Sequence, residues 1–199
     1  SYEWNELESA EQKLSQALDL GKRYTEELGK YYMEAFLLIP GSLVLARVLH
    51  ARGKTAEAQQ LLQELVVLTQ ERKWIYLHRE VLAYQARLQL SMGDVAAVQR
   101  WLTTIAQLGK DFRLLQREQE ALITARLRIA QGEAEEALRL LENWQAVTHA
   151  QRRTRSELEI QILIALAQLA RKQLPQARQT LREALALAQT EGYQRLFLD

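Results

Sequence analysis

One short phrase of sequence returns about every forty residues along this chain. It consists of Ala, Gly seven residues later, a small residue five further on, and Leu four after that. The copies are Ala46, Gly53, Ala58, Leu62; Ala86, Gly93, Val98, Leu102; Ala125, Gly132, Ala137, Leu141; and Ala165, Lys172, Ala177, Leu181. The leading alanines are 40, 39 and 40 residues apart. A fixed period of this size is typical of stacked helix pairs.

The spacing within each copy has a physical cause. Seven residues make about two helical turns, so the leading Ala lies on one stripe near the end of a first helix. Gly then ends that helix, because it adopts a left-handed conformation without strain. A half copy opens the chain with Asn5, Ala10 and Leu14, and Asn is the next best residue for the left-handed position. Lys172 replaces Gly in the fourth copy, so we expect strain in that turn.

The composition agrees with an all-α chain. Of the 199 residues, 48% are hydrophobic and 26% are charged, which is enough for a buried core. Gly and Pro number only 8 and 2, and strong helix formers dominate. No segment alternates with period two over the length of a strand. The sequence therefore predicts a right-handed α-solenoid of antiparallel helix pairs, similar to tetratricopeptide repeats (TPR) but with repeats of about 40 residues.

We expect one solenoid domain over residues 1–199. A half repeat (1–29) with a helix over about 6–28 lacks its first helix, so the chain is expected to be a piece of a longer protein. An irregular part (30–41) follows, then repeats at about 42–72, 73–109, 110–149 and 150–191, and an exit tail (192–199). The helices predicted within the repeats are 42–52, 54–71, 74–92, 94–108, 114–131, 133–147, 152–171 and 175–190.

Several classes of function are excluded by what the sequence lacks. It contains no cysteine, which removes disulfides and thiolate chemistry, and no apolar run that we expect to span a membrane. The formal net charge is +1, and the most basic run, 152–155, is interpreted as a solvated helix start. No signal peptide is recognisable at the start, so a cytoplasmic location is expected.

Three segments carry a resemblance to a known family. They are 2–10 with Tyr2, Trp4 and Asn5; 86–101 with Gly93 and Trp101; and 184–199, which ends in Gly192, Tyr193, Gln194, Arg195, Leu196, Phe197, Leu198 and Asp199. Together they resemble the TPR-like region of the large ATP-dependent LuxR-type transcription regulators named for the maltose activator MalT. The last segment resembles the end of that region, which precedes the DNA-binding domain in the family.

The resemblance implies a three-part protein with a nucleotide-binding switch module upstream and a helix-turn-helix downstream. No phosphate-binding loop occurs in these 199 residues, so we expect no cofactor here and ATP only in the upstream domain. We also expect no direct nucleic-acid binding by this region. The family role implies sensing of a small-molecule inducer or a regulatory protein, with self-association. Two alternatives remain open: a constitutive scaffold that recruits a protein partner, and an accessory domain of an enzyme.

Three arginines share one repeat position. Arg47, Arg87 and Arg126 each follow the leading Ala, whereas the fourth copy has Leu166 there. In TPR geometry this position of the first helix faces the concave groove, and the planar guanidinium suits carboxylate, phosphate or sugar hydroxyls. His50 lies three residues after Arg47 and is expected to share this groove. The alternative is that the arginines form ion pairs between repeats, for which the candidates are Glu80, Glu120 and Glu157.

A second group of candidates is aromatic. Trp74, Tyr76 and Tyr84 lie on one predicted helix and can stack on sugars or partner side chains, or fill gaps between repeats. Trp4, Trp101 and Trp144 are interpreted as packing residues. The three histidines are too far apart for a metal site. The acidic pairs, such as Glu118 with Glu120, are expected on solvated helix faces and not in a catalytic pocket, so the chain is predicted not to be an enzyme.

Overall fold

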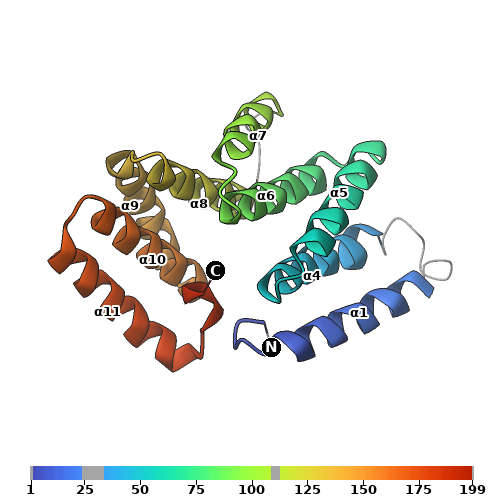
Figure 1. The fold of residues 1–199 in the computed structure, drawn as a ribbon, viewed down its shortest axis with the longest axis horizontal. Coiled ribbons are helices and arrows are strands. Elements are labelled where there is room, and N and C mark those ends of the chain that lie inside the picture. The colour runs from blue at the N-terminus through green and yellow to red at the C-terminus, as the bar shows by residue number, and fades with distance from the viewer. Residues whose placement is uncertain (1, 24–33, 109–112, 199) are drawn as a thin grey trace. The chain divides into compact units, whose positions relative to one another are not determined.

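A computed structural model describes residues 2–23, 34–108 and 113–198, and all of its regular elements in these ranges are helical (Figure 1). The elements are α1 (Leu7–Arg23), η1 (Glu34–Leu38), α4 (Ile39–Ala51), α5 (Thr55–Glu71), α6 (Ile75–Ser91), α7 (Val95–Gln107), α8 (Leu114–Ala130), α9 (Ala134–Ala150), α10 (Thr154–Ala170), α11 (Leu174–Glu191) and η2 (Arg195–Phe197). The predicted all-α fold of antiparallel helix pairs is confirmed.

The beginning of α4 differs from the sequence prediction. This helix begins at Ile39, whereas the sequence predicts an irregular part that extends through the proline and glycine at 40–41. Pro40 occupies the first turn, where the missing backbone N–H costs no intrahelical hydrogen bond. Immediately before it, Glu34–Leu38 forms a short π-helical segment. The remainder of the predicted irregular part, and the end of the helix predicted over 6–28, lie outside the described residues.

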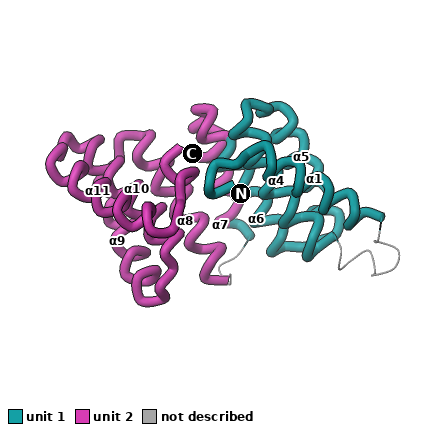
Figure 2. Tube along the Cα trace, turned by 90° about the horizontal axis from the view of Figure 1, so that it is seen from below, with its two compact units in different colours: residues 1–88, 107–109 teal, residues 89–106, 110–199 magenta. Residues whose placement is uncertain are grey.

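The chain divides into two compact units (Figure 2). The first comprises residues 1–88 and 107–109, and therefore contains α1, η1, α4, α5 and most of α6. The second comprises residues 89–106 and 110–199, with α7 to α11 and η2. Within the first unit α4 packs on α1 and α5, and within the second α10 packs on α9 and α11. Each unit is thus built from helices that pack on their neighbours in sequence.

The turns inside the helix pairs adopt the conformation that the repeat predicts. Gly53, Gly93 and Gly132 have φ angles of 80°, 83° and 82°. After Gly53, the amide of Lys54 donates to the carbonyl of Leu49 at 2.9 Å, while Gly53 N–H donates to His50 O at 2.9 Å. This pair of bonds is the Schellman arrangement, which satisfies carbonyls at the end of the helix.

Residues with side chains adopt the same conformation where Gly is absent. Lys172 has a φ of 62° and Asn5 one of 61°, as the aligned copies of the motif predict. Lys73 and Arg152, in the turns that join one helix pair to the next, also have positive φ. A left-handed conformation is unfavourable for residues with a Cβ. The backbone of Lys73, Arg152 and Lys172 is therefore locally strained, and the packing of the flanking helices offsets this unfavourable energy.

The core of the first unit is formed largely by α4 and α5. Ile39, Leu43 and Leu62 are almost completely buried there. The segment Glu34–Ala51 is long and apolar enough to cross a membrane by length and composition, with a mean hydropathy of 1.4, although the sequence analysis expected no such run. Of this segment 44% is buried, and its residues Ile39 and Leu43 belong to this core, so packing within the unit accounts for part of its hydrophobicity.

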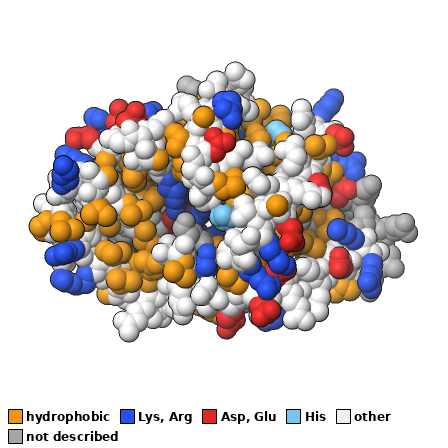
Figure 3. Space-filling model, in the orientation of Figure 1, with side chains coloured by type: hydrophobic (Ala, Val, Ile, Leu, Met, Phe, Trp, Pro, Cys, Tyr) orange, Lys and Arg blue, Asp and Glu red, His pale blue; other side chains and the backbone are white. Residues whose placement is uncertain are grey.

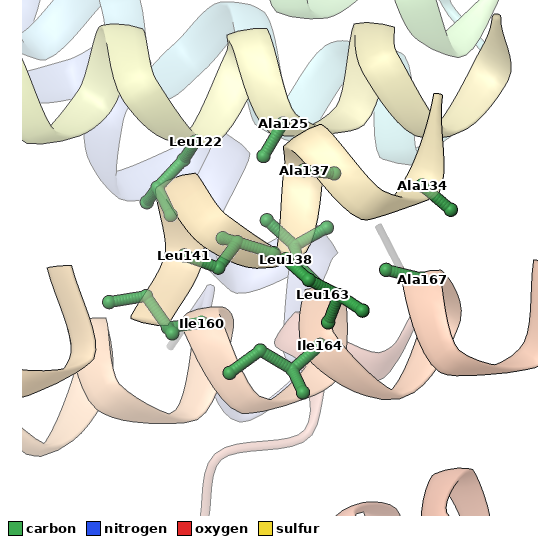
Figure 4. Close-up of a cluster of buried hydrophobic side chains, with 10 residues drawn as sticks. All are labelled: Leu122, Ala125, Ala134, Ala137, Leu138, Leu141, Ile160, Leu163, Ile164 and Ala167. Atoms are coloured by element: carbon green, nitrogen blue, oxygen red, sulfur yellow. The ribbon is translucent and has the colours of Figure 1, made fainter. Parts of the chain in front are cut away.

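The core of the second unit joins three successive helices (Figure 4). Small residues at the repeat positions allow close approach: Ala125 and Ala137 are completely buried between α8 and α9. Leu141 from α9 meets Ile160 and Leu163 from α10, so each helix pair covers apolar surface of the preceding one. The leading alanines of all four copies are buried, with exposed fractions of 3%, 0%, 0% and 6%.

Candidate functional site

Arg47 and His50 lie near the end of α4, in the first unit. The guanidinium carbon of Arg47 lies 4.5 Å from the ring centroid of Tyr2, a cation–π contact. Nδ1 of His50 lies 3.0 Å from Oγ1 of Thr55, across the turn to α5. Tyr2 is itself buried against Ala10 and Val48. Both candidate side chains are therefore half-buried and positioned by local contacts.

Arg126 lies on α8, in the second unit, and points to the next first helix. Its Nη2 donates to Oε1 of Glu159 on α10 at 2.8 Å. Glu159 also accepts a hydrogen bond from Arg155 at 3.3 Å, and only 4% of its side chain is exposed. Arg126 thus makes an ion pair between repeats, with a glutamate that the sequence analysis did not single out.

A second ion pair joins the same two helices. Glu118 on α8 contacts Arg153 at the start of α10, and the exposed fractions of the two side chains are 6% and 21%. Two predictions are therefore wrong here: Glu118 is not on a solvated face, and Arg153 is not part of a solvated helix start. Burial of both groups follows from the packing of α10 on α8, since a charge is buried only when it is paired.

The other candidates lie on α6 or just before it. Arg87 is half-buried in the first unit. Trp74 and Tyr84 pack against the apolar core of that unit, and the guanidinium of Arg72 lies 6.0 Å from the Trp74 ring. Tyr76 is different, because 53% of it is exposed, next to the equally exposed Ile75. Of the three aromatic candidates, Tyr76 has the surface that a partner can contact.

The remaining tryptophans give a mixed result. Trp101 is 5% exposed and Trp144 packs against the core of the second unit, so both are packing residues as predicted. Trp4 is 56% exposed, which contradicts the prediction that it packs. It lies beside the turn at Asn5, where the chain enters α1.

The chemistry of these positions is that of recognition. Guanidinium groups, an imidazole and aromatic rings can bind an anion or a hydroxyl-rich ligand. Within the described residues, no cluster of three or more His, Asp or Glu side chains has the arrangement of a metal site. The polar groups gathered between α8 and α10 pair with each other, which stabilises the contact of successive first helices.

Comparison with known proteins agrees with this architecture. A family model that describes the MalT-like TPR region matches residues 1–199, which is the whole chain. The chain belongs to the MalT-like TPR region family. TPR-like helical repeats mediate protein interactions, so this MalT-like region is a protein-interaction module, of a fold that is typically non-catalytic.

A solved structure shares the fold of this MalT-like TPR region. One is a variant, with a glutamine replaced by methionine, of nearly identical TPR-like repeats from a putative kinesin light chain of Podosopora anserina. It is 21% identical, covers 91% of this chain and 97% of its own, and has a TM-score of 0.51. A second structure of these Podosopora anserina repeats is also 21% identical; it covers 90% of this chain and 97% of its own, with a TM-score of 0.49. No curated protein matches the MalT-like region.

Proposed function

We propose that this MalT-like TPR region is the sensory and protein-interaction region of a bacterial LuxR-type transcription regulator. The observation that carries the proposal is the family match over residues 1–199. A small-molecule inducer or a regulatory protein binds the first helices of the repeats. Binding shifts the population between two ways of docking on neighbouring domains or on a second copy.

The residues proposed for this site are Arg47, His50, Arg87 and Arg126, with Trp74, Tyr76 and Tyr84 as secondary contacts. Their shared repeat position on α4, α6 and α8 supports the assignment of the arginines. The region is cytoplasmic and not an enzyme. It needs no cofactor, because ATP binds the upstream domain, and the downstream domain binds DNA. We expect the repeats at 42–72, 73–109, 110–149 and 150–191 to belong to one solenoid domain.

A thermal-shift screen with sugars, nucleotides and small organic acids tests sensing. A true effector raises the melting temperature with a concentration dependence that matches its affinity. Arg87→Ala should abolish that shift while the melting temperature without ligand stays close to wild type. The matched control is Arg139→Ala, an exposed arginine on the second helix α9. Loss of stability without loss of ligand affinity in Arg87→Ala would overturn the site.

The ion pair of Arg126 with Glu159 favours a second candidate, a constitutive scaffold that binds a protein partner and senses no small molecule. In that case the arginines stabilise the contacts between repeats. The thermal-shift screen is then flat, while immobilised regulatory proteins or peptides still bind. The sequence encoded on either side of this region separates the two further: a phosphate-binding loop upstream and a helix-turn-helix downstream support the regulator.

A further inference from the structure

In the second unit, the pair α8–α9 shows how one repeat receives the next helix. Leu122 and Ile129 on α8, with Leu138 and Leu141 on α9, belong to the core against which α10 packs. The residues that α10 contributes are Ile160, Leu163, Ile164 and Ala167. Their spacing of i, i+3, i+4 and i+7 is that of one face of an amphipathic helix. The face formed by α8 and α9 is therefore a seat for an apolar helix stripe.

The pair α10–α11 repeats this seat forty residues later, but with its apolar groups in contact with solvent. Leu169 corresponds to Ile129 and Leu181 to Leu141. Leu141 is completely buried, whereas Leu181 is 39% exposed and Leu169 is 52% exposed. Leu166, Leu174 and Leu185 are also exposed, by 46%, 43% and 50%. We call these five side chains the leucine face.

Residues 193–197 cover only the other part of this seat. Leu196 packs on Leu158 of α10 and on Ala184 of α11, and Tyr193 and Phe197 pack against the same cluster. The leucine face remains outside that cluster. On α11 it runs from Leu174 to Leu185, which is about three helical turns or roughly 16 Å. Exposed apolar surface of this extent is a mark of an interaction site, and hydrophobic side chains gather over α10 and α11 in the space-filling view (Figure 3).

Positive charge borders the leucine face along one edge of α11. Arg178 lies one turn from Leu174 and from Leu181, and Arg182 lies one turn further along; both residues are exposed. Arg178 occupies the repeat position at which α9 has the apolar Leu138. Glu183 projects from α11 well away from this edge, because it is five residues beyond Arg178. The edge is therefore complementary to acidic side chains.

We propose that the leucine face binds one amphipathic helix of a partner protein, with acidic residues along the edge that meets Arg178 and Arg182. The helix presents apolar side chains at i, i+3, i+4 and i+7, as α10 does to the preceding repeat. A partner helix of about 12–15 residues matches the length of the face. This surface uses none of the residues proposed for effector binding, so the inference stands independently of the sensory role.

Fluorescence anisotropy with a labelled synthetic helical peptide tests the proposal. The peptide carries Ile, Leu, Ile and Ala at the spacing of 160, 163, 164 and 167, and Glu along one edge; a control peptide has Lys in place of each Glu. We expect the 199-residue protein to bind the acidic peptide more tightly, with an advantage that shrinks as salt is added. Arg178→Glu should reverse the preference between the two peptides.

Substitutions of exposed leucines complete the test. Leu181→Gln should weaken binding of the acidic peptide about tenfold, since part of a leucine side chain no longer becomes buried. Leu115→Gln on α8 is the matched control, because Leu115 is 64% exposed outside the face, and it should leave binding unchanged. Equal binding of both peptides, no binding of either, or an unaffected Leu181→Gln overturns the proposal. So does light scattering that shows a dimer which Leu181→Gln dissociates and the peptide does not, because the occupant is then a second copy.

Discussion

Nη2 of Arg126 on α8 lies 2.8 Å from Oε1 of Glu159 on α10, and the Glu159 carboxylate is almost completely buried. This ion pair joins the first helices of two successive repeats. Glu159 has a second cationic partner in Arg155. The desolvation of a buried carboxylate is offset only while its ionic contacts with both arginines are kept. The arginine of the repeat motif is therefore part of the contact between repeats in the second unit, whatever else it binds.

Replacing Glu159 with Gln should destabilise the second unit by about 2–3 kcal/mol, because two guanidinium groups lose their carboxylate. Urea unfolding followed by far-UV circular dichroism measures this loss. The control is Glu136→Gln, whose side chain is 54% exposed in its contact with Arg128 and should change stability by less than about 1 kcal/mol. The double variant Arg126→Met with Glu159→Leu should recover part of the loss. Equal effects of the two Gln variants would contradict the assigned role.

The turn at Lys172 should become more stable when its left-handed residue is Gly. Because Lys172 has a φ of 62°, Lys172→Gly should relieve backbone strain. Gly also raises the conformational entropy of the unfolded chain, so the net gain in the free energy of unfolding should be roughly 0.5–1 kcal/mol. Lys172→Ala keeps a Cβ and should give no gain. Chemical denaturation of the three proteins measures the difference, and an equal gain for Ala and Gly would show that the backbone conformation is not the cause.

Gly53→Ala should have the opposite effect, with a loss of about 1 kcal/mol. A Cβ at Gly53 meets nothing within 4 Å, so the expected loss comes from the φ of 80° and not from a clash. Gly41 is a useful contrast, because a Cβ there lies 2.9 Å from a side-chain carbon of Leu18. Thermal unfolding of Gly53→Ala checks the prediction; unchanged stability would mean that the turn adjusts its backbone.

The helix pairs could be predicted from sequence because their signal is local. Gly53, Gly93 and Gly132 mark the ends of first helices, and the aligned copies predicted positive φ at Asn5 and Lys172 without any glycine there. The buried ion pairs could not be predicted in this way. Glu159 is 33 residues from Arg126, and only the packing of α10 on α8 decides which acidic side chain is buried beside it.

The start of α4 and the exposure of Trp4 were missed for similar reasons. The Pro–Gly pair at 40–41 is a turn signal, but proline is equally suited to the first turn of a helix, and packing of α4 selects the second outcome. The position of Trp4 near a turn of the repeat predicts that it packs, whereas 56% of it is exposed. Its exposure depends on which elements lie beside the turn at Asn5, and the sequence carries no signal for that.

His78 should make the first unit less stable at mildly acidic pH. Its Nδ1 lies 2.9 Å from Oγ1 of Thr69, and burial lowers the pKa of His78 below its usual value of 6.5. As pH falls below about 6.5, the unfolded chain binds a proton that folded His78 does not, so folding loses stability. His78→Gln should reduce the difference in unfolding free energy between about pH 7.5 and 5.5. The same difference in His78→Gln and in the wild type would contradict this role of His78.

Glu11 connects α1 to the turn between α4 and α5, and its contribution should vanish in acid. Its two carboxylate oxygens accept hydrogen bonds of 2.7 Å from Lys54 and Arg52. The hydrogen bond from Lys54, with the charges of Arg52 and Lys54, holds the pKa of Glu11 below its usual value of 4.5. A carboxylate with a lowered pKa stabilises the fold above its unfolded pKa, and that stability is lost as pH falls through the folded value.

Glu11→Gln should therefore reduce stability at neutral pH and flatten the loss of stability on acidification below about pH 4.5. Glu8→Gln is the control on the same helix, because the Glu8 side chain is 90% exposed at 3.5 Å from Arg52. Denaturant titrations at neutral and acidic pH compare the two variants with the wild type. If Glu8→Gln and Glu11→Gln behave alike, the attachment of α1 does not depend on the Glu11 carboxylate, and its apolar contacts through Ala10 and Leu14 hold it in place instead.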